Sequence, residues 1–343
     1  MFTTRCVPDL DALPADCAPL LAAADFFATR AWWRSVLAAG MPGGGEPCFL
    51  LCSDAQRPTA IVPLLKSNRA LQSLTNPYTC LWHPLLEAGI DPSAIQRAGQ
   101  ALGEFWRGWP TVRLEAIADD WPALEPLLAG ARRAGLLAAR YAHFGNWHEP
   151  IAGRSFDQYL AARPGALRET VRRKLRRVDA TLEIVSTPDG VEAGIAAYEE
   201  IYAHSWKVPE PFPRFNAAMM REAAGIDALR LGLLHAKGRA IAAQIWIVFD
   251  GRATVLKLAH DEADKELSPG TVLTALMLRE LIDREQVSEL DFGRGDDAYK
   301  RLWATQRRQR IGVLLTNPRR PAGLAALARQ WGGAVRRRLL CGR

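Results

Sequence analysis

Residues 290–303 constrain the fold most strongly, because they join an apolar strand end to a helix through two closely spaced glycines. Residues 290–292 are typical of a buried strand, and Gly293 and Gly295 permit a sharp turn that other residues make only at a steric cost. Two carboxylates and a lysine follow this turn. In α/β folds, polar groups beyond a strand end often form a binding site, although a capped helix after an ordinary turn explains the same residues equally well.

The length and composition of the chain indicate a globular protein of two ordinary domains. Its 343 residues are 49% hydrophobic and 24% charged, which allows each half to bury a core of its own. The net charge of +7 favours acidic partners such as phosphates, nucleic acid or an anionic membrane surface, without choosing among them. Composition therefore excludes general disorder and leaves the ligand open.

The cysteines and the apolar pattern bear on metal binding and on location. The six cysteines are scattered without metal-ligand spacing, and Cys48 and Cys52 lie in an apolar strand-like run, so we expect buried free thiols and no metal site. Residues 1–20 lack the basic start and continuous apolar segment of a secretory signal, and no later apolar run is long enough to span a bilayer. We therefore expect a cytoplasmic protein.

The same order of elements, a helix followed by a hairpin, occurs in each half of the chain. A predicted helix at residues 26–39 precedes a hairpin within residues 49–65, and a helix at residues 191–206 precedes a hairpin within residues 229–249. The pattern repeats with little identity of residues. It predicts two pseudo-repeated α/β units, joined near residues 148–156.

Other patterns complete the expected order of elements. Further helices are expected at residues 95–106, 122–135, 156–179, 214–224 and 271–284, and further strands at residues 112–117, 136–144, 182–185, 253–259 and 311–315. The last of these strands is expected to close the sheet of the second half.

Six short motifs follow one another in residues 156–318. They are Ser205-Trp-Lys207, Pro209-Glu-Pro-Phe-Pro-Arg214, Ala243-Gln-Ile-Trp246, Lys257-Leu-Ala259, Leu267-Ser-Pro-Gly-Thr271 and Gly295-Asp-Asp-Ala-Tyr-Lys300 with Trp303. Their order and spacing resemble the GNAT acyltransferase superfamily, and within it the cellulose-biosynthesis-type (CelD/BcsL-like) group, related to the Fem-type peptidoglycan aminoacyl transferases. The first half resembles, more loosely, the degraded second copy of the fold that such proteins often carry.

The resemblance implies an α/β (α+β) fold with a mixed, strongly twisted sheet flanked by helices, in two tandem GNAT-like domains. Residues 1–150 are expected to form the degenerate domain, residues 151–318 the acyltransferase domain, and residues 319–343 a basic amphipathic helix. It also implies acyl-CoA (acetyl-CoA) as co-substrate and no metal. The thioester is expected between the strands at residues 253–259 and 290–292.

The turn from Ser268 to Gly270 is the expected coenzyme site. It opens a helix at Thr271, whose free backbone N–H groups and positive dipole end suit a pyrophosphate, and Lys265 precedes it. Most of the superfamily carries an Arg or Gln followed by two spaced glycines here, so coenzyme A binding follows from the resemblance and not from a phosphate motif. A helix with proline near its first turn explains these residues nearly as well.

Acyl transfer needs a base for the acceptor, a donor for the thioester oxygen and an acid for the leaving thiolate. Exposed N–H groups of the strand at residues 253–259 can polarise the carbonyl, and Tyr299 can serve as the acid. The available bases are His260, Asp261, Asp296 and Asp297. We favour Asp296 or Asp297, because adjacent carboxylates repel and one can keep a raised pKa. A solvated helix cap is the alternative.

The expected acceptor site combines aromatic and basic residues. Trp206 and Lys207 can form an acceptor wall, and Lys257 and Lys300 can bind phosphate or the acceptor. Gln244 and Arg294 complete the predicted substrate-binding set. The alternatives are a core position for Trp206 and lysine stems that merely cover apolar surface.

Three functions fit these residues. The leading prediction is a transferase that moves an acyl group from acyl-CoA to an amine or hydroxyl of a sugar or polysaccharide precursor. The second takes its acyl group from aminoacyl-tRNA, whose phosphates suit the basic run at residues 172–177, although such a run is usually a solvated face. Apart from tRNA, we expect no nucleic-acid partner. The third is a catalytically idle GNAT scaffold that is accessory to polysaccharide export.

The C-terminal tail has an amphipathic pattern. One helical stripe holds Leu324, Leu327, Trp331, Val335 and Leu339, while Arg329, Arg336, Arg337 and Arg338 lie mostly away from it. The stripe can dock on the second domain, or it can lie on an anionic membrane and bring the protein to the inner membrane face. Gly332 and Gly333 weaken an autonomous helix by roughly 1 kcal/mol each, which favours docking.

Overall fold

The computed structural model describes residues 2–22 and 25–341, and thirteen strands within them form one hydrogen-bonded sheet. The strands are β1 (Phe2–Val7), β2 (Glu46–Asp54), β3 (Arg57–Lys66), β4 (Leu71–Ser73), β5 (Leu85–Leu86), β6 (Thr111–Ala118), β7 (Leu137–Pro150), β8 (Thr181–Val185), β9 (Leu229–Ala236), β10 (Arg239–Phe249), β11 (Arg252–His260), β12 (Glu289–Arg294) and β13 (Gln306–Thr316). Their order is β1-β2-β3-β4-β6-β13-β7-β12-β11-β10-β9-β8, and β5 pairs with β3. The β4–β6 and β11–β12 pairs are parallel and the remaining pairs antiparallel, so the predicted mixed sheet is confirmed.

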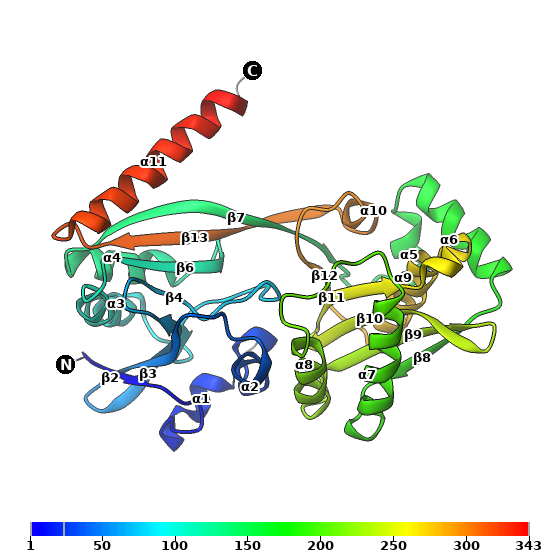
Figure 1. The fold of residues 1–343 in the computed structure, drawn as a ribbon, viewed down its shortest axis with the longest axis horizontal. Coiled ribbons are helices and arrows are strands. Elements are labelled where there is room, and N and C mark those ends of the chain that lie inside the picture. The colour runs from blue at the N-terminus through cyan, green and yellow to red at the C-terminus, as the bar shows by residue number, and fades with distance from the viewer. Residues whose placement is uncertain (1, 23–24, 342–343) are drawn as a thin grey trace.

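Helices flank this sheet, as predicted (Figure 1). They are α1 (Ala18–Leu21), α2 (Arg30–Ala39), α3 (Pro92–Trp106), α4 (Leu124–Arg133), α5 (Phe156–Ala161), α6 (Gly165–Arg177), α7 (Pro188–Ala203), α8 (Phe215–Ala224), α9 (Pro269–Arg279), α10 (Lys300–Trp303) and α11 (Pro321–Cys341). The helix predicted at residues 156–179 is divided into α5 and α6, because Pro164 between them has no N–H with which to continue α5.

Two long strands, β7 and β13, connect the halves of the molecule (Figure 1). They pair antiparallel from Gln306 opposite His148 to Thr316 opposite Leu137. The prediction that residues 311–315 close the sheet of the second half is therefore wrong, since β13 lies between β6 and β7. The expected link near residue 148 is also part of β7. The two predicted hairpins lie toward opposite ends of one sheet, and the exact domain boundaries stay a prediction.

The halves also share a hydrophobic core, centred on Phe215 of α8. Its ring lies edge-on to Trp32 of α2, with 5.5 Å between ring centroids, and is stacked on Tyr78 at 4.5 Å. A side chain at Gly40, which ends α2, would meet the Phe215 ring at 2.5 Å. These contacts hold the segment around Tyr78, which belongs to the first half, against the second half.

A buried carboxylate, Asp291, fixes the position of β12 beside β7 and β13. It accepts hydrogen bonds from Asn146 Nδ2 at 2.6 Å and from the backbone N–H of Gly293 at 2.7 Å, and Arg308 Nη2 donates at 2.5 Å. Burial alone would raise the pKa of Asp291, but the Arg308 and Arg310 guanidinium groups outweigh it and hold the pKa below the usual range. The carboxylate therefore stays charged, although little water reaches it.

The structure corrects one prediction about the cysteines. Cys48 is joined to Cys6 by a disulfide between β1 and β2, whereas Cys52 is buried and free as expected. The described residues contain no cluster of histidine, cysteine or carboxylate side chains that can hold a metal ion.

The tail forms helix α11, which contacts β6 and β13 and then projects away from the sheet (Figure 1). Leu327 is buried near its start. The side chains of Trp331, Val335, Leu339 and Arg336 to Arg338 lie outside the described part of the structure, so contact with a membrane stays a prediction. No helix within the described residues is long and apolar enough to cross a bilayer.

We predict that Asp291→Asn lowers the free energy of unfolding by about 3 kcal/mol at pH 7, because it removes the carboxylate that pairs with the half-buried Arg308 and attracts the buried Arg310. The pKa of Asp291 is lowered, so its contribution is complete above the unfolded carboxyl pKa, about 3.9, and is lost as pH falls through the folded pKa. Urea unfolding at several pH values should show the variant approaching the wild type only below about pH 4.

Arg221→Ala, which breaks the exposed Arg221–Glu192 pair, is the control and should leave the urea midpoint nearly unchanged. An Asp291→Asn protein as stable as the wild type at pH 7 would show that the network contributes no net stability.

Candidate functional site

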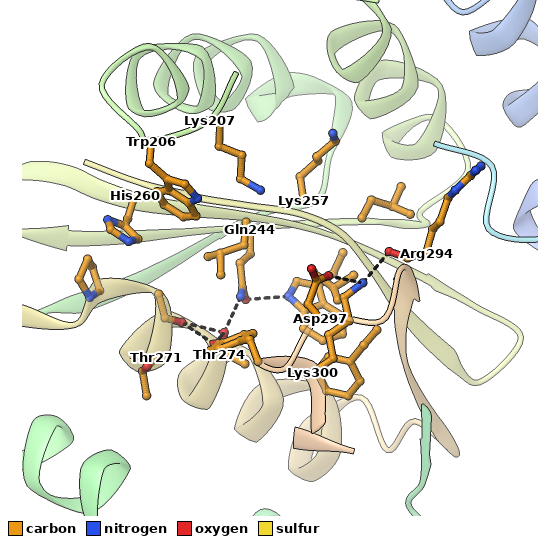
Figure 2. A pocket seen from close by; sticks show the side chains of 18 of the residues that line it. Trp206, Lys207, Gln244, Lys257, His260, Thr271, Thr274, Arg294, Asp297 and Lys300 are labelled. Carbon is orange, nitrogen blue, oxygen red and sulfur yellow. Dashed lines mark hydrogen bonds and ion pairs between the residues drawn. The ribbon is translucent and has the colours of Figure 1, made fainter. Parts of the chain in front are cut away.

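A cavity of about 690 Å³ lies where β11 and β12 meet the start of α9 and a segment from the first half of the chain (Figure 2). The predicted site residues that line it are Trp206, Lys207, Gln244, Lys257, His260, Lys265, Ser268, Gly270, Thr271, Arg294, Asp297, Tyr299 and Lys300. The first half adds Pro77, Tyr78 and Cys80, which sequence reasoning missed. The dipeptide Asn76-Pro77 signals a turn there, but nothing in it indicates contact with residues more than 100 positions away.

The cavity opens because β11 and β12 separate. They pair only from Arg252 opposite Glu289 to Thr254 opposite Asp291. Just beyond, Gly293 has φ +64°, and a Cβ on it would lie 2.6 Å from the carbonyl oxygen of Val255. Only glycine tolerates both conditions, so this residue is required where the strands part. Beyond Thr254, the edge of β11 that faces β12 has no ladder partner in the described residues.

Helix α9 begins against this open edge of β11. Ser268 has a left-handed backbone with φ 56°, and its carbonyl accepts from the N–H groups of Thr271 and Val272 at 3.0 and 3.1 Å. A Cβ on Gly270 would be only 3.4 Å from Leu258, so the first turn lies close to the strand. The positive end of the helix and the nearby Lys265 therefore face one end of the cavity.

A chain of hydrogen bonds forms the polar floor (Figure 2). Trp246 Nε1 donates to Gln244 Oε1 at 2.9 Å, and Gln244 Nε2 donates to Thr274 Oγ1 at 2.5 Å. Thr274 donates to the Gly270 carbonyl at 2.7 Å, and its oxygen lies 2.9 Å from the Tyr299 hydroxyl. Burial raises the pKa of Tyr299 to about 12, so this phenol keeps its proton at neutral pH.

At the opposite wall, Lys257 and Tyr78 both bind the carboxylate of Glu210. Glu210 accepts from Lys257 Nζ at 2.6 Å through one oxygen and from the Tyr78 hydroxyl at 2.7 Å through the other. Burial alone would raise the pKa of Glu210, but the hydrogen bonds from Lys257 and Tyr78 outweigh it and hold the pKa low. Glu210 lies in the motif Pro209–Arg214, but the sequence predicted no role for it in the site. Tyr78 comes from the first half of the chain.

Trp206 and Lys207 lie on the loop after α7 and face His260 and Lys257 (Figure 2). The Trp206 ring is 4.4 Å from the His260 ring and is 51% exposed, so its alternative assignment as a core residue is wrong. Lys207 Nζ lies 5.3 Å from the Trp206 ring centroid. Burial and then the charge of Lys257 lower the pKa of Lys207.

The two adjacent aspartates have different surroundings. Asp297 lines the cavity, and its carboxylate is 3.4 Å from Lys300 Nζ. Asp296 points away from the cavity and accepts from Arg307 Nε at 3.0 Å and Trp147 Nε1 at 2.6 Å. Those two hydrogen bonds lower the pKa of Asp296. The predicted role of Asp296 as a base with a raised pKa is therefore wrong.

One further cavity residue is a thiol. Cys80 lies on the first-half segment, is buried, and lines the cavity beside the point where β11 and β12 part. Burial and then the charge of Asp291 raise its pKa to about 12.

Comparison with known proteins agrees with this arrangement. Residues 165–301 match the family model of the Acetyltransferase (GNAT) domain. The matched region includes the loop after α7, β10, β11, α9 and β12, which together build most of the cavity. No curated protein matches the chain in sequence.

Solved structures show a GNAT-like fold over nearly the whole chain. FemX has a TM-score of 0.60 at 11% identity, over 85% of this chain and 92% of its own. L-PGS from Bacillus licheniformis has a TM-score of 0.51 at 11% identity, over 85% and 92%. A tandem GNAT protein from the clavulanic acid biosynthesis pathway has a TM-score of 0.52 at 12% identity, over 91% and 98%. The similarity in fold therefore extends over the first half as well, while the CelD/BcsL-like grouping stays a prediction.

We predict that Gly293→Ala both destabilises the protein and weakens coenzyme A binding at least tenfold, because its methyl group would push Val255 and alter the separation of β11 and β12. Gly89→Ala is the matched control, since Gly89 also has positive φ, +71°, with nothing within 4 Å of the added carbon. The free energy of unfolding of the control should fall only by about 1–2 kcal/mol, which is the cost of a left-handed backbone in a residue with a Cβ. Its coenzyme A binding should equal that of the wild type. Thermal unfolding and calorimetric titration measure both effects, and equal losses in the two variants would contradict the assignment.

Proposed function

We propose that the protein transfers an acyl group from acyl-CoA to an amine or hydroxyl of a sugar or polysaccharide precursor. The observation that carries the proposal is the cavity itself, where an unpaired edge of β11 lies beside the first turn of α9. That arrangement offers backbone donors to a thioester and a positive helix end to a pyrophosphate. The match of residues 165–301 to a GNAT acetyltransferase domain supports acyl-CoA as the donor.

The proposed donor site uses Lys265, Ser268, Gly270 and Thr271. The pyrophosphate would bind at the positive dipole end of α9, near the N–H of Gly270, with Lys265 as a further positive charge. The close approach of Gly270 to Leu258 leaves the thioester arm a short path from α9 to the edge of β11. N–H groups on that edge would stabilise the negative charge that develops on the thioester oxygen.

The proposed chemistry assigns one proton transfer to each side of the reaction. Asp297 would accept the proton of the attacking amine or hydroxyl, and Lys300 would hold that carboxylate in place. The new bond forms at the thioester carbon as the carbon–sulfur bond breaks. Tyr299, which is protonated at neutral pH, would donate to the leaving thiolate. The His260 ring is tilted against the Trp206 ring and lies beside Gly270, which places it near the donor end.

A second candidate, transfer from aminoacyl-tRNA, is favoured by one separate feature. A groove of about 480 Å³ between α5, α6 and α9 is lined by Arg172, Arg176 and Arg279. Two of these arginines come from the basic run at residues 172–177, so part of that run faces a concave surface together with α9. Three guanidinium groups on a concave surface suit the phosphates of a nucleic acid.

We predict that acetyl-CoA binds with saturation to the full-length protein, and that Lys265→Met weakens binding about tenfold by removing one charge from the pyrophosphate site. Lys66→Met, which removes an exposed lysine of β3, should bind acetyl-CoA as the wild type does. Isothermal titration measures both affinities. Absence of saturable binding would reject the acyl-CoA proposal and favour the tRNA donor or the idle scaffold.

For the tRNA candidate, the expected result is binding of deacylated tRNA that weakens steeply with salt and is lost when Arg172, Arg176 and Arg279 are all changed to alanine. Filter binding at several salt concentrations measures it, and acetyl-CoA titration checks that the triple variant is folded. If the wild type does not bind tRNA, or the triple variant binds it equally well, this candidate should be dropped.

A further inference from the structure

The cavity holds more positive than negative charge. Its lining includes five cations, Lys207, Lys257, Lys265, Arg294 and Lys300. Lys257 is paired with Glu210 and Lys300 with Asp297, so these two cations are neutralised within the protein. Lys265 lies at the donor end, next to Ser268. Lys207 and Arg294 remain without a carboxylate partner in the described residues.

Lys207 is the more sheltered of these two cations. Arg294 is exposed and lies over the Phe144 ring at 4.6 Å, with one nitrogen 3.4 Å from His143. Lys207 is half-buried, and its contact within the protein is with the face of Trp206. The charged groups around its ammonium are Lys257, Glu210, Asp297 and Lys300, which form the two internal ion pairs. A sheltered charge without a counter-ion is costly, and a bound anion would remove that cost.

The position of Lys207 places this anion on the acceptor side. Lys207 lies on the loop after α7, whereas the proposed donor residues lie at the start of α9 and just before it. In Figure 2, Lys207 lies on one side of the strand that carries Lys257 and His260, and Thr271 lies on the other side. The donor pyrophosphate at α9 would therefore leave Lys207 unpaired. Asp297, the proposed base, is among its neighbours, so an anion held by Lys207 would lie close to the attacking atom.

We infer that the acceptor carries an anionic group, a phosphate or a carboxylate, and that Lys207 binds this group beside Asp297. The inference rests on the proposed acyl transfer and narrows its acceptor to an acidic sugar or a sugar phosphate. Glu210 has a positioning role, because it holds Lys257 and thereby prevents that lysine from competing for the anion. Trp206 supplies an apolar wall for the uncharged part of the acceptor.

Pairs of probes that differ by one anionic group test the inference. Full-length protein is first saturated with coenzyme A, so that the donor phosphate site is filled. Glucosamine 6-phosphate is then compared with glucosamine, and galacturonate with galactose, by isothermal titration. We expect at least one probe with the anionic group to bind tenfold or more tightly than its counterpart without that group, and added salt to reduce that preference.

Lys207 variants show whether this residue causes the preference. Lys207→Met should abolish it while leaving coenzyme A affinity and the affinity for the probe without the anionic group unchanged. Lys207→Arg should keep the preference, and Lys66→Met, which removes an equal charge far from the cavity, should behave as the wild type. The coenzyme A titration also verifies that each variant is folded.

Equal affinity for both members of each pair, or a preference that survives in Lys207→Met, would overturn the inference. A protein that binds coenzyme A but does not discriminate between the probes leaves the transferase proposal standing and removes only the anionic acceptor. A protein that does not bind coenzyme A would contradict both the proposed transfer from acyl-CoA and the anionic acceptor.

Discussion

The separation of β11 from β12 is the constraint on which the rest of the site depends. Asp291 is held by Asn146, Arg308 and the N–H of Gly293, which fixes β12 beside β7 rather than along the full length of β11. Gly293 then turns away directly opposite Val255. The buried ion network around Asp291 thus keeps β12 apart from the rest of β11. Beyond Thr254, the edge of β11 has no ladder partner within the described residues, and the cavity forms along that edge.

The two halves contribute unequally to this cavity. The second half supplies the strands, α9 and most charged groups, whereas the first half supplies one wall at Tyr78 and Cys80. Stacking of Tyr78 on Phe215 makes that wall part of the core shared by both halves. Through Glu210, the same tyrosine connects to Lys257 on β11. The first half is therefore part of the site.

The sequence predicts the features that are local in the chain. The turn at Gly293, the helix start after Ser268 and the tryptophan-lysine pair at Trp206 are short patterns with a physical cause, and all three lie at the cavity. The wall at Tyr78 depends on core packing between distant segments, and the central position of β13 depends on its register with β7. Asp296 and Asp297 are indistinguishable by pattern, and the positions of Arg307 and Trp147 in the fold separate them.

The thiol of Cys80 has a consequence for the proposed transfer from a thioester. A thiolate there would exchange with the donor and leave the protein acylated on its own cysteine, since thioester exchange requires the ionised sulfur. With a pKa of about 12, only about one Cys80 side chain in 10⁵ is ionised at pH 7. Burial thus protects the protein against acylating itself, and a change that admits water to Cys80 would convert this wall into a competing acceptor.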